Sequence, residues 1–325
     1  MGKDALNEFW NYKPTFVSVD TETTGVGFYD YPFSASIAWL VEDWIQSFFF
    51  DLKDENDCAD LVIILSSASN LVFHNAKFDL QKFKLAGIYD WRMRENSRTV
   101  EDTSIIAHLV NEHQSKKLKD LAVNVLGLEP LEEKALNDKL RELKIKKSEG
   151  FHNLPIEILK PYALKDAEYT IQSFNALYPL LSEGVREIYD LEKHLLFAFL
   201  DMEERGMKLD TSYLDTKIDE YRTLYFNSVI ELRRLTNNDE FNPNSSQQLV
   251  SALGDQGIIV SSAGAEVLDS LKASPLVAEV LKFRNTHKML NTYLENLKEM
   301  QHEGIIHPNF HSSRARTGRI SSSTG

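Results

Sequence analysis

The sequence has little cysteine and no long apolar run. Cys58 is the one cysteine in 325 residues, so no disulfide can form within the chain, which suits a reducing compartment. No apolar stretch approaches the roughly 18 residues that a membrane-spanning helix needs. The N-terminal segment lacks the apolar core of a secretion signal. These absences predict a cytoplasmic protein that makes no use of a membrane.

Several chemical motifs are also missing. The sequence has no nucleophile elbow, no Gly-rich phosphate loop and no Cys/His zinc spacing. His108 and His113 lie five residues apart without an accompanying carboxylate motif, which disfavours a metal site there. These absences argue against a serine hydrolase, a nucleotide-binding P-loop protein and a zinc protein.

Positive charge is scarce relative to negative charge. The net charge is −13, from 36 basic and 49 acidic residues. Taken alone, this disfavours a nucleic-acid partner, because phosphate binding normally needs a basic surface. Carboxylates clustered to hold divalent metals would also lower the net charge, so the placement of the acids matters more than their sum.

The first part of the chain shows the pattern of an α/β protein. Residues 15–20, 33–41 and 45–52 are rich in apolar, β-branched and aromatic residues, which predicts three strands in an antiparallel meander. Residues 71–75 predict a fourth strand, followed by a helix that ends at Gly87. The alternation of strands and helices predicts layers of helix and sheet.

From about residue 102 the pattern is mostly helical. Asp102 is a candidate N-cap, and the charged run 129–150 predicts a solvated helix or loop. A long helix is expected from near Lys160, with Pro161 in its first turn. A new amphipathic helix begins near residues 182–190. We therefore expect one domain over residues 1–185 and an elongated helical region over 186–325.

The segment Asp20-Thr21-Glu22 places two carboxylates at the end of the first predicted strand. Residues i and i+2 of a strand point to the same face, so both acids project together. Two like charges held side by side need a positive partner, and a hard divalent cation prefers carboxylate oxygens. The alternative is a solvent-exposed acidic turn.

Two further acids recur at helical spacing. Asn75 and Asp79 lie four residues apart at the start of the predicted helix, and Tyr162 and Asp166 lie four apart on a later one. This spacing puts each pair on one helix face. The alternatives are a capping Asn75 with a surface Asp79, and a buried Tyr162 with a salt-bridged Asp166.

The three motifs together, in this order, resemble those of the DEDD exonuclease superfamily in its tyrosine subtype. The likeness extends from about residue 14 to 323, and over this range the chain is similar to family A DNA polymerases of the phage type. The segments that carry it include "DTSIIAHLV", "LEKHLLFAFLDMEERGMKLD", "FNPNSSQQLVSAL" and "TGRISSS". The resemblance implies a ribonuclease-H-like domain, a mixed sheet flanked by helices, followed by a thumb-like region and the start of a palm.

The resemblance also implies a reaction and its residues. A 3′→5′ exonuclease of the proofreading type would hold two Mg²⁺ or Mn²⁺ ions on Asp20, Glu22, Asp79 and Asp166. Tyr162 would orient the attacking water, because the phenol's ordinary pKa is too high for it to serve as a base at neutral pH. His74 and Asn75 would contact the terminal nucleotides, and a capping or structural role for His74 is the alternative.

The expected partner is DNA, as a single-stranded or frayed 3′ end or a primer–template. Arg is suited to phosphate by its bidentate fork. The residues at positions where the family contacts the primer–template backbone are Arg314, Arg316, Thr317 and Arg319. On the thumb-like helix, Lys282, Arg284 and Lys288 could add to this contact. A solvated basic face is the alternative for both groups.

The polymerase motifs that follow in the family are absent from this sequence. The palm aspartate, the fingers lysine and the "HDE"-like motif would lie beyond residue 325, so we expect no primer extension by this chain alone. It would be either a fragment or one subunit of a split polymerase with a separate palm and fingers chain. Two other functions remain open: a non-catalytic DNA-binding subunit of such a polymerase, and an exonuclease that processes RNA.

Overall fold

The structure, a computed structural model, describes residues 2–93, 99–145, 151–315 and 317–324. The chain forms two compact units. One takes in the chain up to Arg205 and again from Pro308 onward, and the other is Gly206–His307. This division differs from the boundary expected at residues 185 and 186. The reason is that helix α8 (Glu183–Arg205) packs against helices and two strands of the first unit.

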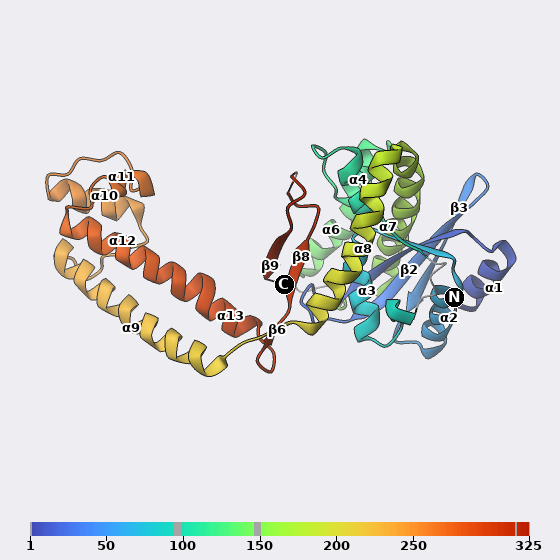
Figure 1. Ribbon diagram of the computed structural model, residues 1–325, viewed down its shortest axis with the longest axis horizontal. Helices are drawn as coiled ribbons and strands as arrows, with labels where there is room; N and C mark the ends of the chain where they lie inside the picture. The colour runs from blue at the N-terminus through green and yellow to red at the C-terminus, as the bar shows by residue number, and fades with distance from the viewer. Residues whose placement is uncertain (1, 94–98, 146–150, 316, 325) are drawn as a thin grey trace. The chain divides into compact units, whose positions relative to one another are not determined.

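The first unit is built from helices on both sides of a sheet (Figure 1). Its described helices and strands, besides α8, are α1 (Gly2–Tyr12), β1 (Phe16–Thr23), β2 (Pro32–Val41), β3 (Trp44–Asp51), α2 (Glu55–Ser67), β4 (Asn70–Phe73), α3 (Ala76–Leu85), η1 (Trp91–Met93), β5 (Thr99–Asp102), α4 (Thr103–Val110), α5 (Leu118–Asn124), α6 (Leu131–Leu143), α7 (Ile156–Leu177), η3 (Tyr178–Leu180), β8 (Pro308–His311) and β9 (Ser321–Thr324).

The sheet is mixed, with strand order β3-β2-β1-β4-β5. Strand β2 pairs antiparallel with both β1 and β3, whereas β1, β4 and β5 run parallel to one another. The predicted α/β class and the antiparallel meander are therefore confirmed. Strand β5 was not predicted, because three of its four residues, Thr99–Asp102, are polar and the segment carries little periodicity.

Strand β1 lies near the centre of the sheet, and its alternating side chains face different helices. Ser18 Oγ lies 2.7 Å from the carbonyl oxygen of Ala167 on α7. Thr21, on the opposite face, donates from its backbone N and its hydroxyl to Asp79 on α3, at 3.0 and 2.6 Å. The even-numbered residues of β1 therefore face α7 and the odd-numbered ones face α3.

Helix α7 begins at Ile156, so the expected start near Lys160 was wrong. Pro161 lies in the second turn, where its missing N–H removes one bond of the helical ladder. The helix extends past it because Leu159, Ala163 and the following apolar residues are buried against the rest of the unit. Burial thus outweighs the local signal that proline gives.

Asp102 joins two strand-to-helix turns. Its carboxylate caps α4 by accepting from Ser104 N at 2.8 Å, and it also accepts from Ala76 N at 2.8 Å and Asn75 N at 3.1 Å at the start of α3. The predicted N-cap is confirmed, and the same side chain fixes the loop that carries His74 and Asn75.

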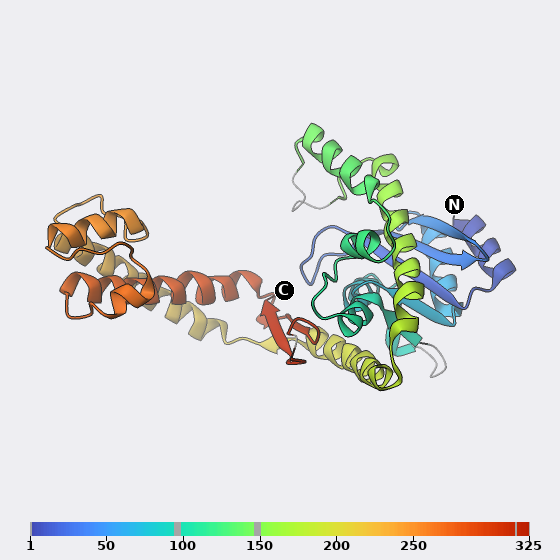
Figure 2. The same ribbon diagram turned by 90° about the horizontal axis from the view of Figure 1, so that it is seen from above.

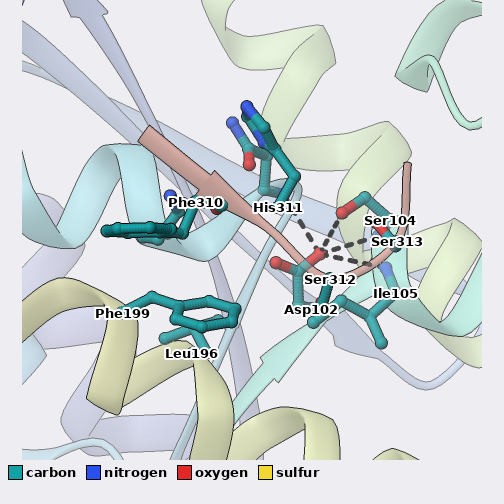
Figure 3. A pocket seen from close by; sticks show the side chains of 11 residues that line it. Asp102, Ser104, Ile105, Leu196, Phe199, Phe310, His311, Ser312 and Ser313 are labelled. Carbon is teal, nitrogen blue, oxygen red and sulfur yellow. Dashed lines mark hydrogen bonds between the residues drawn. The ribbon is translucent and has the colours of Figure 1, made fainter. Parts of the chain in front are cut away.

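Strand β8 returns to the first unit after the chain has passed through the second. Phe310 stacks on Phe199 of α8 (Figure 3), and their ring centroids are 5.8 Å apart. The Lys77 ammonium pairs with the Glu203 carboxylate and donates to Asn309 Oδ1 and the Phe310 carbonyl at 2.5 and 2.7 Å. These contacts hold β8 against α3 and α8.

The second unit is mainly helical and has its own apolar core. Its elements are β6 (Met207–Lys208), α9 (Thr211–Thr236), α10 (Ser246–Asp255), α11 (Ala265–Asp269), α12 (Pro275–His287), the π-helical segment η4 (Lys288–Leu294), α13 (Glu295–Met300) and β7 (Ile305–Ile306). Helices α9 and α12 lie side by side, as Figure 2 shows, and bury Leu232, Val280 and Phe283. Among the described residues, no helix is both long and apolar enough to cross a membrane.

Candidate functional site

Three carboxylates converge where β1 meets α7. One oxygen from each of Asp20, Glu22 and Asp166 lies within 4.8 Å of the other two. Asp20 and Glu22 share a face of β1, and that face is the one covered by α7, which supplies Asp166. Glu22 and Asp166 are buried and Asp20 is partly buried. The strand's two-residue period therefore assembles the cluster.

Asp79 lies outside this group of three. It sits on α3, on the opposite face of β1, where its Oδ1 accepts both hydrogen bonds from Thr21. Its charge is still close enough to raise the pKa of Asp20. Three of the four predicted acids thus form a tight group. The fourth, Asp79, is hydrogen-bonded to Thr21, which lies between Asp20 and Glu22 in β1.

The electrostatics of the cluster are unfavourable without a cation. Burial, followed by repulsion from Asp166, Asp79 and Glu22, holds the pKa of Asp20 well above its usual range. Burial also raises the pKa of Asp166, although Lys119 and Tyr162 oppose the rise. Burial raises the pKa of Asp79 to about 7. Each shift records the cost of placing negative charge in a site of low polarity.

The donor set fits a hard divalent cation. All the convergent atoms are carboxylate oxygens, which Mg²⁺ and Mn²⁺ favour over nitrogen and sulfur. A cation among them would supply positive charge that offsets the repulsion between these carboxylates. The residues present therefore suit the predicted metal.

Tyr162 and Lys119 border the cluster. Tyr162 lies one helical turn before Asp166, and burial followed by the charges of Asp166, Glu22 and Asp20 raises the pKa of its phenol. The Lys119 ammonium, on α5, pairs with Asp166 and lies 4.3 Å from the centroid of the Tyr162 ring. Sequence reasoning missed Lys119. Its one local signal is that it shares a helix face with buried Ala122.

The two residues expected to contact a terminal nucleotide are oriented differently. His74 Nδ1 lies 2.8 Å from Thr103 Oγ1, and burial lowers the pKa of the imidazole. Asn75 is exposed, adopts a left-handed conformation with φ 70°, and makes no side-chain capping bond.

The arginine-rich segment between β8 and β9 belongs to the first unit. Arg314, Thr317 and Arg319 are exposed there, and the predicted Arg316 lies outside the described residues. Burial, and to a smaller extent the charge of Arg314, lowers the pKa of both Lys77 and Lys116. In the second unit, the Arg284 guanidinium donates to the Ala263 carbonyl at 2.8 Å, and the Lys282 ammonium pairs with the Glu279 carboxylate at 3.2 Å.

The strand order, the flanking helices and the acids on the first strand define a ribonuclease-H-like α/β protein with an acidic site. Comparison with known families makes this specific. Residues 3–182 match the family described as 3′-5′ exonuclease, and residues 213–325 match DNA polymerase family A. The chain belongs to the 3′-5′ exonuclease family, as it occurs in family A DNA polymerases.

The relatives are phage and bacterial polymerases. The chain is 27% identical to DNA polymerase DpoZ of Salmonella phage PMBT28, over 95% of this chain and 52% of that protein. It is 28% identical to the DNA polymerase of Escherichia phage T5, over 80% of this chain and 34% of the relative. It is 32% identical to DNA polymerase I of Chloroflexus aurantiacus, over 77% and 27%. The chain thus spans about half the length of these relatives or less.

A solved structure shares the fold. The POL domain of Pol1 from M. smegmatis, in complex with DNA primer-template and dNTP, superposes with a TM-score of 0.72 at 19% identity. The match covers 98% of this chain and 53% of that chain. The similarity therefore extends over both units, and the fold predicted from the sequence is confirmed.

The raised pKa of Asp79 gives a prediction for stability in EDTA. An acid whose pKa is near 7 when folded and about 4 when unfolded binds more protons in the native state. Stability from this group is therefore full below pH 4 and falls as the pH rises toward 7. We expect the free energy of unfolding to fall between pH 5 and 8 by at most about 3 kcal/mol more than in Asp79→Asn.

Chemical denaturation of both proteins across that pH range tests this. Asparagine keeps an oxygen that can accept the bonds from Thr21, so the comparison isolates the ionisation. Equal pH dependence in the two proteins would contradict the raised pKa. Adding Mn²⁺ at pH 8 should stabilise the parent more than it does at pH 5.

Proposed function

We propose that this chain hydrolyses DNA from its 3′ end, one nucleotide at a time, with divalent cations. The observation that carries the proposal is the convergence of Asp20, Glu22 and Asp166 in a chain of the 3′-5′ exonuclease family. Asp20, Glu22 and Asp166 would hold one Mg²⁺ or Mn²⁺ ion, and Asp79 would complete the site for a second.

The bound cations would lower the pKa of a water and stabilise the charge on the phosphate and on the departing 3′ oxygen. The chain's own groups do the positioning. The raised pKa keeps the Tyr162 hydroxyl protonated, so Tyr162 orients the attacking water without taking its proton. Asn75, which is exposed, would hydrogen-bond the terminal nucleotide through its amide, and His74 would hold the loop through Thr103.

The substrate in this proposal is a single-stranded or frayed 3′ end of DNA, because the terminal nucleotide must leave the duplex to reach the acids. Arg314 and Arg319, with Thr317 between them, would bind backbone phosphate as exposed donors. The phage and bacterial relatives support a proofreading role in the bacterial cytoplasm.

Replacing both acids of β1 is the direct test of the reaction. We expect Asp20→Asn with Glu22→Gln to reduce nucleotide release from a 5′-labelled DNA oligonucleotide by at least about 1,000-fold, because hydrolysis loses two of its cation ligands. Circular dichroism should remain that of the parent. Release at the parent's rate would refute the site, and faster release from RNA than from DNA would favour an RNA substrate.

Tyr162→Phe separates orientation from cation binding. We expect release to slow by about 10- to 100-fold while the Mn²⁺ affinity stays within twofold of the parent, because the lost hydroxyl positions water but ligates nothing. The measurement pairs single-turnover release with calorimetric titration of Mn²⁺. An unchanged rate would remove Tyr162 from the reaction.

The match of residues 213–325 to DNA polymerase family A supports a second proposal: the helical unit binds primer–template for a palm and fingers outside this chain. We expect primer extension only when a protein bearing those parts is mixed with this chain. Extension by this chain alone would contradict the proposal. A chain that binds primer–template but releases no nucleotide with any cation would instead be a non-catalytic DNA-binding subunit.

A further inference from the structure

Lys119 is a positively charged side chain that reaches the carboxylate cluster. Its ammonium pairs with Asp166 and lies 2.8 Å from Glu132 Oε1 on α6. The side chain is 14% exposed, and its two acidic partners are similarly covered, at 11% for Glu132 and 10% for Asp166. The pair with Asp166 is thus shielded from water. Charge interactions are stronger in such a shielded site than in water.

Two aromatic rings and a hydrogen bond fix this arrangement. The Lys119 ammonium lies 4.3 Å from the centroid of Tyr162 and 5.0 Å from that of Tyr169. The Tyr169 hydroxyl donates to the other oxygen of Glu132 at 3.0 Å. Glu132 is therefore held in place beside Lys119, and it shares the lysine charge with Asp166.

This geometry has a consequence for the charge of the site. Asp20, Glu22 and Asp166 bring three carboxylates together, and Lys119 balances one of them from the side of α5. A cation ligated by Asp166 must then share that carboxylate with an ammonium, and the two positive charges repel each other. Lys119 thus stabilises the cluster while no metal is bound and opposes the entry of the metal.

We propose that Lys119 is a positioning residue that acts as an internal counter-ion of the carboxylate cluster and sets its affinity for divalent cations. Glu132 tunes this effect in the opposite direction by drawing the lysine charge away from Asp166. The inference rests on the proposed function, because it assumes that the cluster is a cation site. It concerns the affinity of that site and does not depend on hydrolysis.

Calorimetric titration with Mn²⁺, without DNA, is the test. Lys119→Met keeps an unbranched side chain that can pack on the two rings but removes the charge. We expect this variant to bind Mn²⁺ roughly tenfold more tightly than the parent. It should also unfold at a lower temperature in EDTA and regain more of its stability on addition of Mn²⁺.

Glu132→Gln supplies a prediction of opposite sign. The amide can still accept the bond from Tyr169 but leaves the whole lysine charge to Asp166. We expect Mn²⁺ binding several-fold weaker than in the parent. Lys119→Arg, which keeps the charge, should bind Mn²⁺ within about threefold of the parent. This pair of variants keeps the inference testable if Lys119→Met does not fold.

Lys165→Met is the matched control. Lys165 precedes Asp166 on α7, is 47% exposed and pairs with Glu168. Its loss should leave the Mn²⁺ affinity within twofold. Unchanged or weaker binding in Lys119→Met, or unchanged or tighter binding in Glu132→Gln, would overturn the role of Lys119. A parent that binds no Mn²⁺ at all would instead overturn the proposed cation site.

Discussion

The two-residue period of β1 is the constraint on which the rest of the site depends. Because alternate residues face opposite sides of the sheet, Asp20 and Glu22 meet α7 while Thr21 meets α3. One strand thereby gathers acids from two helices that lie on different layers. A shift of one residue in the register of β1 would turn both acids away from Asp166.

The same arrangement brings carboxylates together at an electrostatic cost to the folded state. Asp20 and Asp166 lie close together where burial raises their pKa, which is unfavourable for folding. Other interactions hold the surrounding elements in place. Asp102 ties the starts of α3 and α4, and the pairing of Lys77 with Glu203 holds β8 against α8. The acidic site is therefore supported by neighbouring contacts that do not involve its own charges.

Sequence patterns were informative where the signal is local. The same-face placement of Asp20 and Glu22 follows from strand geometry, and the spacing of Tyr162 and Asp166 follows from helix geometry. Patterns failed where tertiary packing decides. The bond from Thr21 to Asp79 depends on which face α3 covers, and Lys119 reaches the cluster from a helix distant in sequence. The return of β8 to the first unit likewise leaves no periodic trace.

The central claim is that the end of β1 is a divalent-cation site. Anomalous diffraction from crystals of the protein grown with Mn²⁺ tests it most directly, because manganese is located without reference to activity. The account predicts an anomalous peak within coordination distance of Asp20, Glu22 and Asp166. A map from crystals grown at a saturating concentration of Mn²⁺ that shows no peak at these carboxylates, or shows manganese only elsewhere, would contradict it.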